Sequence, residues 1–324
     1  MKHMIAIAVL VAVALLLAGP ATAADTVQFK LHADKGTQFK MNVTVDQDIT
    51  QEFMGQELAI EQTMGFGTTF KVTDVDADGA LTVEVKYDSV LFKQESAMAS
   101  VEYDSTDPPD DIPMQAAAFA ALVGRGFTMK LSPTAQILEI KGVDKMIDEI
   151  MESMDVPEGV PVEQVKNDLK RQFGDEGLKQ QMQQMFRMLP DKPVGVGDSW
   201  DDEVTVGGMM PVITKSKYTV KAIENGAATI EVETTIAPDE KAKPVEMGNS
   251  TMAMKMTGNQ KGTTQVDLKT GFPLKISMDQ KVTGTITITS DELPGGEMEI
   301  PMTIESTIAV EGKVTTTDDA EDAE

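Results

Sequence analysis

The chain of 324 residues contains no cysteine, only two histidines and a single tryptophan. The absence of cysteine excludes disulfides, thiol catalysis and cysteine-ligated metal centres. Basic residues are also scarce, because 28 Lys and Arg face 53 Asp and Glu and the formal net charge is −25. A nucleic-acid partner is therefore not expected, since phosphate binding requires clustered basic side chains. Aromatic residues make up 5% of the chain, yet 41% of it is hydrophobic, which is enough for a folded core.

Long apolar runs are missing except at the N-terminus. Lys2 precedes an apolar run over residues 5–17, and the small residues Ala21 and Ala23 follow a Gly-Pro pair. A basic start, a short apolar run and an A-x-A site together predict a signal peptide over residues 1–23. The run is too short to span a bilayer. We therefore expect an exported protein, periplasmic or extracellular, that does not span the membrane after cleavage.

An internal repeat is the most informative pattern in the sequence. Each half contains a Gly-led strand start, a hairpin with a tight turn, and a further paired segment, in the same order. The matched pairs are residues 36–39 with 197–200, 70–85 with 218–232, and 131–140 with 268–276. The tight turns contain Asp78-Gly79 and Asn225-Gly226, which favour two-residue hairpin loops. We interpret the chain as two copies of one β unit.

Alternating apolar and polar residues predict two further hairpins with long antiparallel arms, one around Met54-Gly55 and one around the Leu-Pro-Gly-Gly turn at residues 293–296. The arms are expected at residues 39–50, 57–72, 275–289 and 297–310. Because a flat sheet of this size would expose a long edge, we expect a curved sheet or half-barrel. The predicted fold class is α+β, mainly β: duplicated antiparallel β units with a central block of helices. The predicted boundaries are 24–140 for the first β unit, 141–190 for a helical connector and 191–314 for the second β unit. Whether the two units form one sheet or two subdomains stays open.

The helical connector is predicted from apolar spacing. Val143, Met146, Ile147, Ile150, Met151 and Met154 follow the period of a helix with one apolar face. Two further helices are expected within residues 162–189. A fourth, over residues 114–123, is apolar nearly all round, which predicts burial. The acidic residues 315–324 are expected to form a disordered tail.

Catalytic patterns are incomplete. The ladder formed by Asp74, Asp76 and Asp78 resembles the start of a calcium loop, but position twelve is Val85 instead of glutamate. Gly197-Asp198-Ser199 resembles the nucleophile motif of GDSL esterases, but no Asp-x-x-His follows it, and a serine without a base is a poor nucleophile. The acidic pairs 110–111 and 201–202 are more typical of solvated turns or strand ends than of paired catalytic carboxylates. We expect no enzymatic activity, no cofactor and no metal site, with weak calcium or copper binding left open.

Methionine is abundant, with 23 residues. Met252, Met254 and Met256 alternate along one predicted strand, so their thioethers share a face. Such thioethers suit Cu(I) but more often pack a core or line a pliable apolar groove. Together with Met182 and Met185 on a predicted helix, they are our candidate ligand-lining residues.

Several of these segments also resemble a family of uncharacterised exported bacterial proteins, a domain of unknown function. The segments are the signal peptide, the Asp-Gly hairpin after Phe70, residues 189–200 and residues 262–276. The resemblance covers residues 31–310 and implies no activity and no catalytic residues. The predicted architecture of a curved sheet with helices distantly resembles periplasmic lipoprotein carriers and lipid-binding half-barrels.

These observations predict an exported, non-enzymatic binding protein. Its concave sheet is expected to hold a hydrophobic small molecule or lipid. The alternative is a structural or interaction protein of the cell envelope, with an envelope protein as partner and no small ligand.

Overall fold

A computed structural model describes residues 26–53, 55–97, 99–153, 166, 170, 174, 178–179, 188–207, 211–247, 249–293 and 295–316. The elements in chain order are β1 (Gln38–Phe53), β2 (Gln56–Val75), β3 (Leu81–Ser96), β4 (Ser100–Asp104), η1 (Met114–Ala116), α2 (Ala117–Ala120), β5 (Gly126–Leu131), β6 (Ile137–Lys141), α3 (Val143–Ser153), β7 (Ser199–Val206), β8 (Val212–Glu224), β9 (Ala227–Pro238), β10 (Val245–Met247), β11 (Ser250–Asp267), β12 (Pro273–Ser290) and β13 (Glu297–Thr315).

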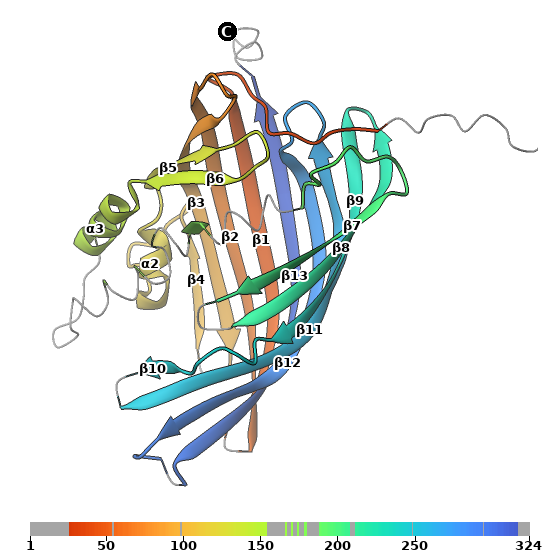
Figure 1. Cartoon of the computed structure of the whole chain (residues 1–324). Helices are drawn as coiled ribbons and strands as arrows, with labels where there is room; N and C mark the ends of the chain where they lie inside the picture. Colours follow the sequence, from red (N-terminus) through yellow and green to blue (C-terminus); the bar gives the residue numbers. More distant parts are fainter. Residues whose placement is uncertain are drawn as a thin grey trace, which may run out of the picture.

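All of these strands form one antiparallel sheet, which answers the question that the sequence left open. The sheet has 13 strands in the order β6-β5-β3-β2-β1-β13-β12-β11-β9-β8-β7, with β4 added on β3 and β10 on β11. Figure 1 shows that it curls into an open half-barrel. The two halves join where β1 pairs with β13 from Gln38↔Thr315 to Gln51↔Met302. The first residue of the predicted tail, Thr315, therefore lies in a strand.

The strand order repeats, in agreement with the duplicated unit. The series β6-β5-β3-β2-β1 and β12-β11-β9-β8-β7 have the same pairing pattern, and β13 is inserted between them. Each copy opens with a glycine in the left-handed region, Gly36 with φ 96° and Gly197 with φ 92°. Their backbone N–H groups donate to the carbonyls of Val72 and Val220, both at 2.8 Å. A side chain at either position would strain this turn, which explains why both copies begin with glycine.

Glycines on the curled face allow strands β11 and β12 to bend. A Cβ added to Gly284 would lie 2.0 Å from the carbonyl oxygen of Lys255 and 2.6 Å from the sulfur of Met256. One added to Gly262 would lie 2.0 Å from the carbonyl oxygen of Ser277. Such close approach of neighbouring strands is a device for sheet curvature. The half-barrel therefore depends on these positions having no side chain.

The helices fit the predictions in part. In α3 the predicted apolar stripe is confirmed, because Val143, Met146, Ile147 and Ile150 are all buried. The predicted burial all round residues 114–123 is wrong: only short helices η1 and α2 form there, and Met114 is 73% exposed. Pro113 fixes the start of η1 and Gly124, with φ 80°, follows the segment, so too few turns form to bury every side chain. The two other predicted helices fall largely outside the described residues.

Candidate functional site

The sheet has one apolar face and one polar face. In β1, Phe39 and Met41 are buried, whereas the alternating Lys40 and Asn42 are exposed. Direct pairing carries this alternation to the neighbouring strands, since Phe39 lies opposite Phe70 on β2 and Val314 on β13. Helix α3 packs on the apolar face, because Ile147 and Ile150 belong to the same buried cluster as Phe39 and Phe70. We call this the inner face.

The proximal part of the inner face is the part that packs with the helices and with residues 27–33. It is rich in aromatic rings. Phe39 stacks on Phe272 with centroids 3.6 Å apart, and Trp200 stacks on Tyr218 at 5.4 Å. A further ring, Phe119 in α2, stacks on Phe92 at 5.2 Å. This part is a conventional packed core, whose rings and branched side chains leave little freedom.

The distal part of the inner face lies toward the ends of the long strands near the β1–β2 and β12–β13 turns, away from residues 27–33. Its cluster contains only aliphatic and methionine side chains, and none of the described helix residues belongs to it. The buried members are Val212, Ile236, Met256, Val282 and Met302, and the half-buried ones are Ile49, Val206, Met254, Ile286 and Ile304. The sheet buries this cluster by curling around it. Several of its side chains therefore keep accessible apolar surface.

A line of polar side chains separates the two parts. Nine consecutive strands of the sheet, from β3 through β1 and β13 to β7, each contribute one inner-face residue to this line. Each of these residues lies directly opposite the next one on the neighbouring strand. We call this line the belt; in sheet order it consists of Gln94, Gln62, Gln47, Ser306, Gln280, Gln260, Thr234, Ser216 and Asp202. The large proximal clusters lie on one side of the belt and the distal cluster on the other.

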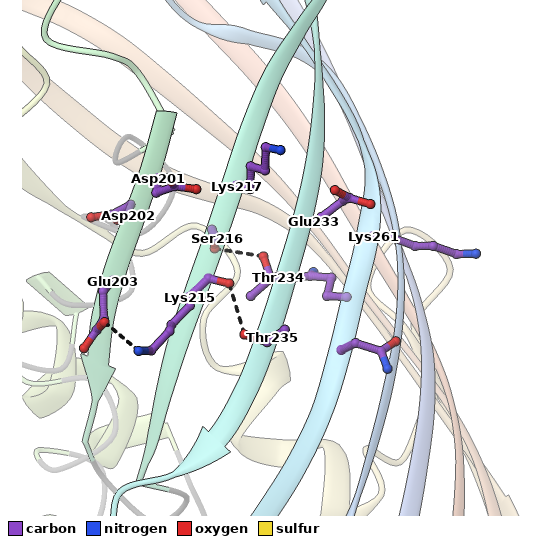
Figure 2. Close-up of a pocket in the computed structure, with 12 residues that line it drawn as sticks. Asp201, Asp202, Glu203, Lys215, Ser216, Lys217, Glu233, Thr234, Thr235 and Lys261 are labelled. Atoms are coloured by element: carbon purple, nitrogen blue, oxygen red, sulfur yellow. Dashed lines mark hydrogen bonds and ion pairs between the residues drawn. The ribbon is translucent and has the colours of Figure 1, made fainter. Parts of the chain in front are cut away.

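Two hydrogen bonds link belt residues across strands. The amide nitrogen of Gln47 donates to Ser306 Oγ at 3.1 Å, and the hydroxyls of Ser216 and Thr234 lie 2.8 Å apart. Figure 2 shows the second pair between β8 and β9, with Asp202 on the adjacent β7. Hollows of about 740, 330 and 360 Å³ lie along this level of the sheet. In most of the strands that line them, the lining consists of a belt residue and its two chain neighbours.

Sequence reasoning did not identify the belt. A local signal existed, because each of these strands has a polar residue within its apolar alternation. Examples are Gln62 between Ile60 and Met64, and Thr234 between Val232 and Ile236. Other inner-face residues such as Thr68 and Thr214, however, interrupt the alternation as well. The register that aligns these interruptions is not visible in any one strand.

The predicted methionine strand is β11. Met252 and Met254 lie opposite Ile288 and Ile286, and Met256 lies opposite Gly284, so all three occupy the inner face of the distal part. Met256 is 0% exposed because its sulfur lies over Gly284, whereas Met254 is half-buried. Met182 and Met185 lie outside the described residues, as do Ala21 and Ala23.

Asp76 and Asp198, from the patterns considered for calcium and catalysis, order turns, whereas the acidic pair Asp201 and Asp202 lies within strand β7. Asp76 accepts the backbone N–H groups of Asp78 at 3.0 Å and Ala80 at 2.9 Å, and it pairs with Lys130 at 2.7 Å. The Lys130 hydrogen bond is the main reason why the pKa of Asp76 is lowered. In the second copy, Asp198 Oδ2 accepts the N–H of Gly195 at 2.8 Å, which orders the turn before Ser199.

The described residues contain no group of three or more His, Cys, Asp or Glu side chains placed to hold a metal ion. None of the helices that the structure describes has the length and apolar character required to cross a membrane.

Comparison with known proteins gives a family and distant structural neighbours. No curated protein matches the chain. A structure of lipovitellin, described by its lipid–protein interactions, aligns at 8% identity and a TM-score of 0.43, covering 87% of this chain and 26% of that one. This chain therefore spans about a quarter of the lipovitellin chain. The outer membrane protein OprG from Pseudomonas aeruginosa aligns at 6% identity and a TM-score of 0.21, covering 88% of this chain and 99% of OprG.

The family match is by sequence and covers residues 78–273, from the turn after β2 to the start of β12. It thus includes the helical segment, most of the second repeat and the methionine strand. Because the matched residues make up more than half of the 324-residue chain, the protein belongs to a family of unknown function, DUF6263.

Proposed function

We propose that the protein is an exported, non-enzymatic binding protein that holds a hydrophobic molecule or lipid against the distal part of its inner face. The observation that carries this proposal is the continuation of the apolar face past the helices. Ile49, Met254, Ile286 and Ile304 there are only half-buried, although they belong to a cluster with a buried centre. A hydrocarbon chain laid on this surface would remove apolar area from water, which is favourable by about 25 cal/mol per Å².

The first test is native mass spectrometry of the mature chain from Ala24 onward, before and after organic extraction. We expect a co-purifying mass that disappears on extraction. A chain that purifies without any added mass and that does not bind an apolar dye at micromolar concentration would contradict the proposal. That result would favour the alternative of an envelope interaction protein.

A matched pair of variants locates the site. Ile286 on the inner face and Thr285 on the outer face are neighbours in β12. Ile286→Glu introduces a carboxylate into the proposed apolar surface and is expected to weaken dye or lipid binding at least about tenfold, because burying a charge is costly. Thr285→Glu changes the net charge equally and should leave binding unchanged. Equal effects of the two variants would place the binding surface elsewhere.

A further inference from the structure

The belt differs chemically from the apolar clusters that lie on either side of it on the inner face. Among the strand residues that the structure describes, Asp202 is the one charged side chain on this face; the lysines of the same strands lie on the outer face. Lys215, for example, pairs with Glu203 at 3.1 Å on the outer face. The rest of the belt consists of carboxamides and hydroxyls. The belt is thus an almost uncharged hydrogen-bonding line between two apolar surfaces.

Several belt amides make no side-chain hydrogen bond within the part of the chain that the structure describes. Gln62, Gln94, Gln260 and Gln280 are half-buried, and no side-chain hydrogen bond joins them to another residue that the structure describes. Each carboxamide offers two N–H donors and one oxygen acceptor. Polar groups in apolar surroundings normally have partners, so these amides are available to a bound molecule or to water.

We propose that the belt binds the uncharged head group of an amphiphile, one with ester, amide or hydroxyl groups, whose hydrocarbon chain lies in the distal part. The proposal rests on the proposed function and specifies the class of ligand. Neutral donors and acceptors match a neutral head group. A phosphate or carboxylate head would be expected to meet Lys or Arg, and the belt supplies none.

The dimensions agree with this arrangement. From Gln47 in the belt to Phe53 at the end of β1 the chain advances 53 − 47 = 6 residues. At about 3.3 Å per residue this is roughly 20 Å, comparable with an extended acyl chain. A head group at the belt would thus have an apolar surface of sufficient length for its hydrocarbon chain on the distal side.

The test compares probes that share a twelve-carbon chain and differ in the head group: 1-monolauroylglycerol, laurate and dodecyltrimethylammonium. Binding to the mature chain is measured by isothermal titration below the critical micelle concentrations. Trp200 provides a second readout, because it is the only tryptophan and lies two residues from Asp202 on the same face of β7. We expect monolauroylglycerol to bind about tenfold more tightly than the two charged probes.

Variants assign this preference to the belt. Gln260→Met combined with Gln280→Met keeps side-chain size but removes the hydrogen-bonding groups from two adjacent strands. Monolauroylglycerol should then bind about tenfold more weakly, whereas laurate binding should not fall. Gln265→Met is the control, because Gln265 lies exposed on the outer face of β11. Gln62→Met, in the first copy, is the second test variant if the double variant does not fold.

The outcomes separate the two proposals. If the three probes bind equally, or if the belt variants leave the preference for monolauroylglycerol unchanged, the belt has no role in head-group selection and that inference is overturned, while the proposed function stands. If neither the probes nor an apolar dye binds the unaltered protein, both proposals are overturned. Equal loss of affinity for all probes in the belt variants would indicate a structural role and would also overturn the inference.

Discussion

The proximal and distal parts of the inner face belong to the same strands, but they are buried in different ways. In the proximal part, the rings of Phe39 and Phe70 pack against Phe272 and belong to the same buried cluster as the apolar stripe of helix α3. In the distal part, aliphatic and methionine side chains pack mainly on their neighbours across a curled sheet. The difference shows that a continuous apolar face need not be a continuous core. Where a second layer is present, the face forms a packed core; in the distal cluster of the described residues, which contains no helix residue, several side chains stay half-buried.

The two parts of the inner face also differ in the types of side chain they contain. Rings and branched side chains with few rotamers specify a rigid core, whereas methionine adapts its shape to its surroundings. Met254 and Met302 both contribute to the distal cluster. A distal surface of this kind can adjust to hydrocarbon chains of different shape. The two parts should therefore respond differently to the same substitution.

The largest expected difference is between two isoleucines on the inner face. Ile230 in β9 is fully buried in the proximal part, and Ile286 in β12 is half-buried in the distal part. Ile230→Ala should lower the free energy of unfolding by about 2–5 kcal/mol, because it removes packed methyl groups and leaves a cavity. Ile286→Ala should cost about 1 kcal/mol or less, since water or neighbouring side chains can fill the space. Urea denaturation of both variants measures the difference.

The difference in stability between the Ile230 and Ile286 variants depends on whether a ligand is bound. Both variants are to be measured after organic extraction, because a bound molecule would stabilise the folded protein and add its own contribution at Ile286. Equal losses in the extracted proteins would mean that the distal part is as tightly packed as the proximal part. The distal part would then not be a binding surface.

Much of the fold could be predicted from the sequence, because the relevant signals are local. Residue pairs such as Asp78-Gly79 and Asn225-Gly226 mark the hairpins in both copies, and the alternation in the arms gives the strands between them. The spacing of apolar residues gives helix α3. The curved sheet follows from strand length and the need to protect edges.

The belt could not be predicted in this way, because it is a property of register. Gln47 and Gln280 lie far apart in the chain and reach the same level only through β13, where Ser306 pairs with both. Each strand alone shows polar residues within an apolar series, and nothing in a single strand distinguishes Ser216 from Thr214 two residues away. The burial of Met252, Met254 and Met256 could not be predicted for a related reason. The burial of a side chain in a sheet depends on the residue opposite it, and the strand pairing places Gly284 opposite Met256.

A smaller difference is expected between two methionines of the same strand, Met256, which is buried, and Met254, which is half-buried. Met256→Ala should lower the free energy of unfolding by about 2–3 kcal/mol, since Met256 is 0% exposed and its sulfur fills the space over Gly284. Met254→Ala should cost less than about 1 kcal/mol but weaken binding of the apolar dye. Thermal unfolding and dye titration of the two variants test this division of roles. A Met254 variant that unfolds as readily as the Met256 variant and binds the dye normally would assign both residues to the core.

The smallest effect expected here compares the two repeat copies at their equivalent turns. In the first copy Asp76 orders the turn and pairs with Lys130, which lowers the pKa of Asp76; the second copy has Asn225-Gly226 at this place. A carboxyl whose pKa is lower in the folded state stabilises the protein above its unfolded pKa of about 3.9, and this stabilisation is lost as the pH falls through the folded value. Asp76→Asn should therefore lose less stability than the unaltered protein when the pH is lowered from about 5 to below 3. Asp78→Asn removes the same charge from the same turn without removing the partner of Lys130, so its stability should fall with pH as in the unaltered protein. Urea denaturation at both pH values separates the ion pair from the general effect of the acidic surface, because only the latter would affect both variants equally.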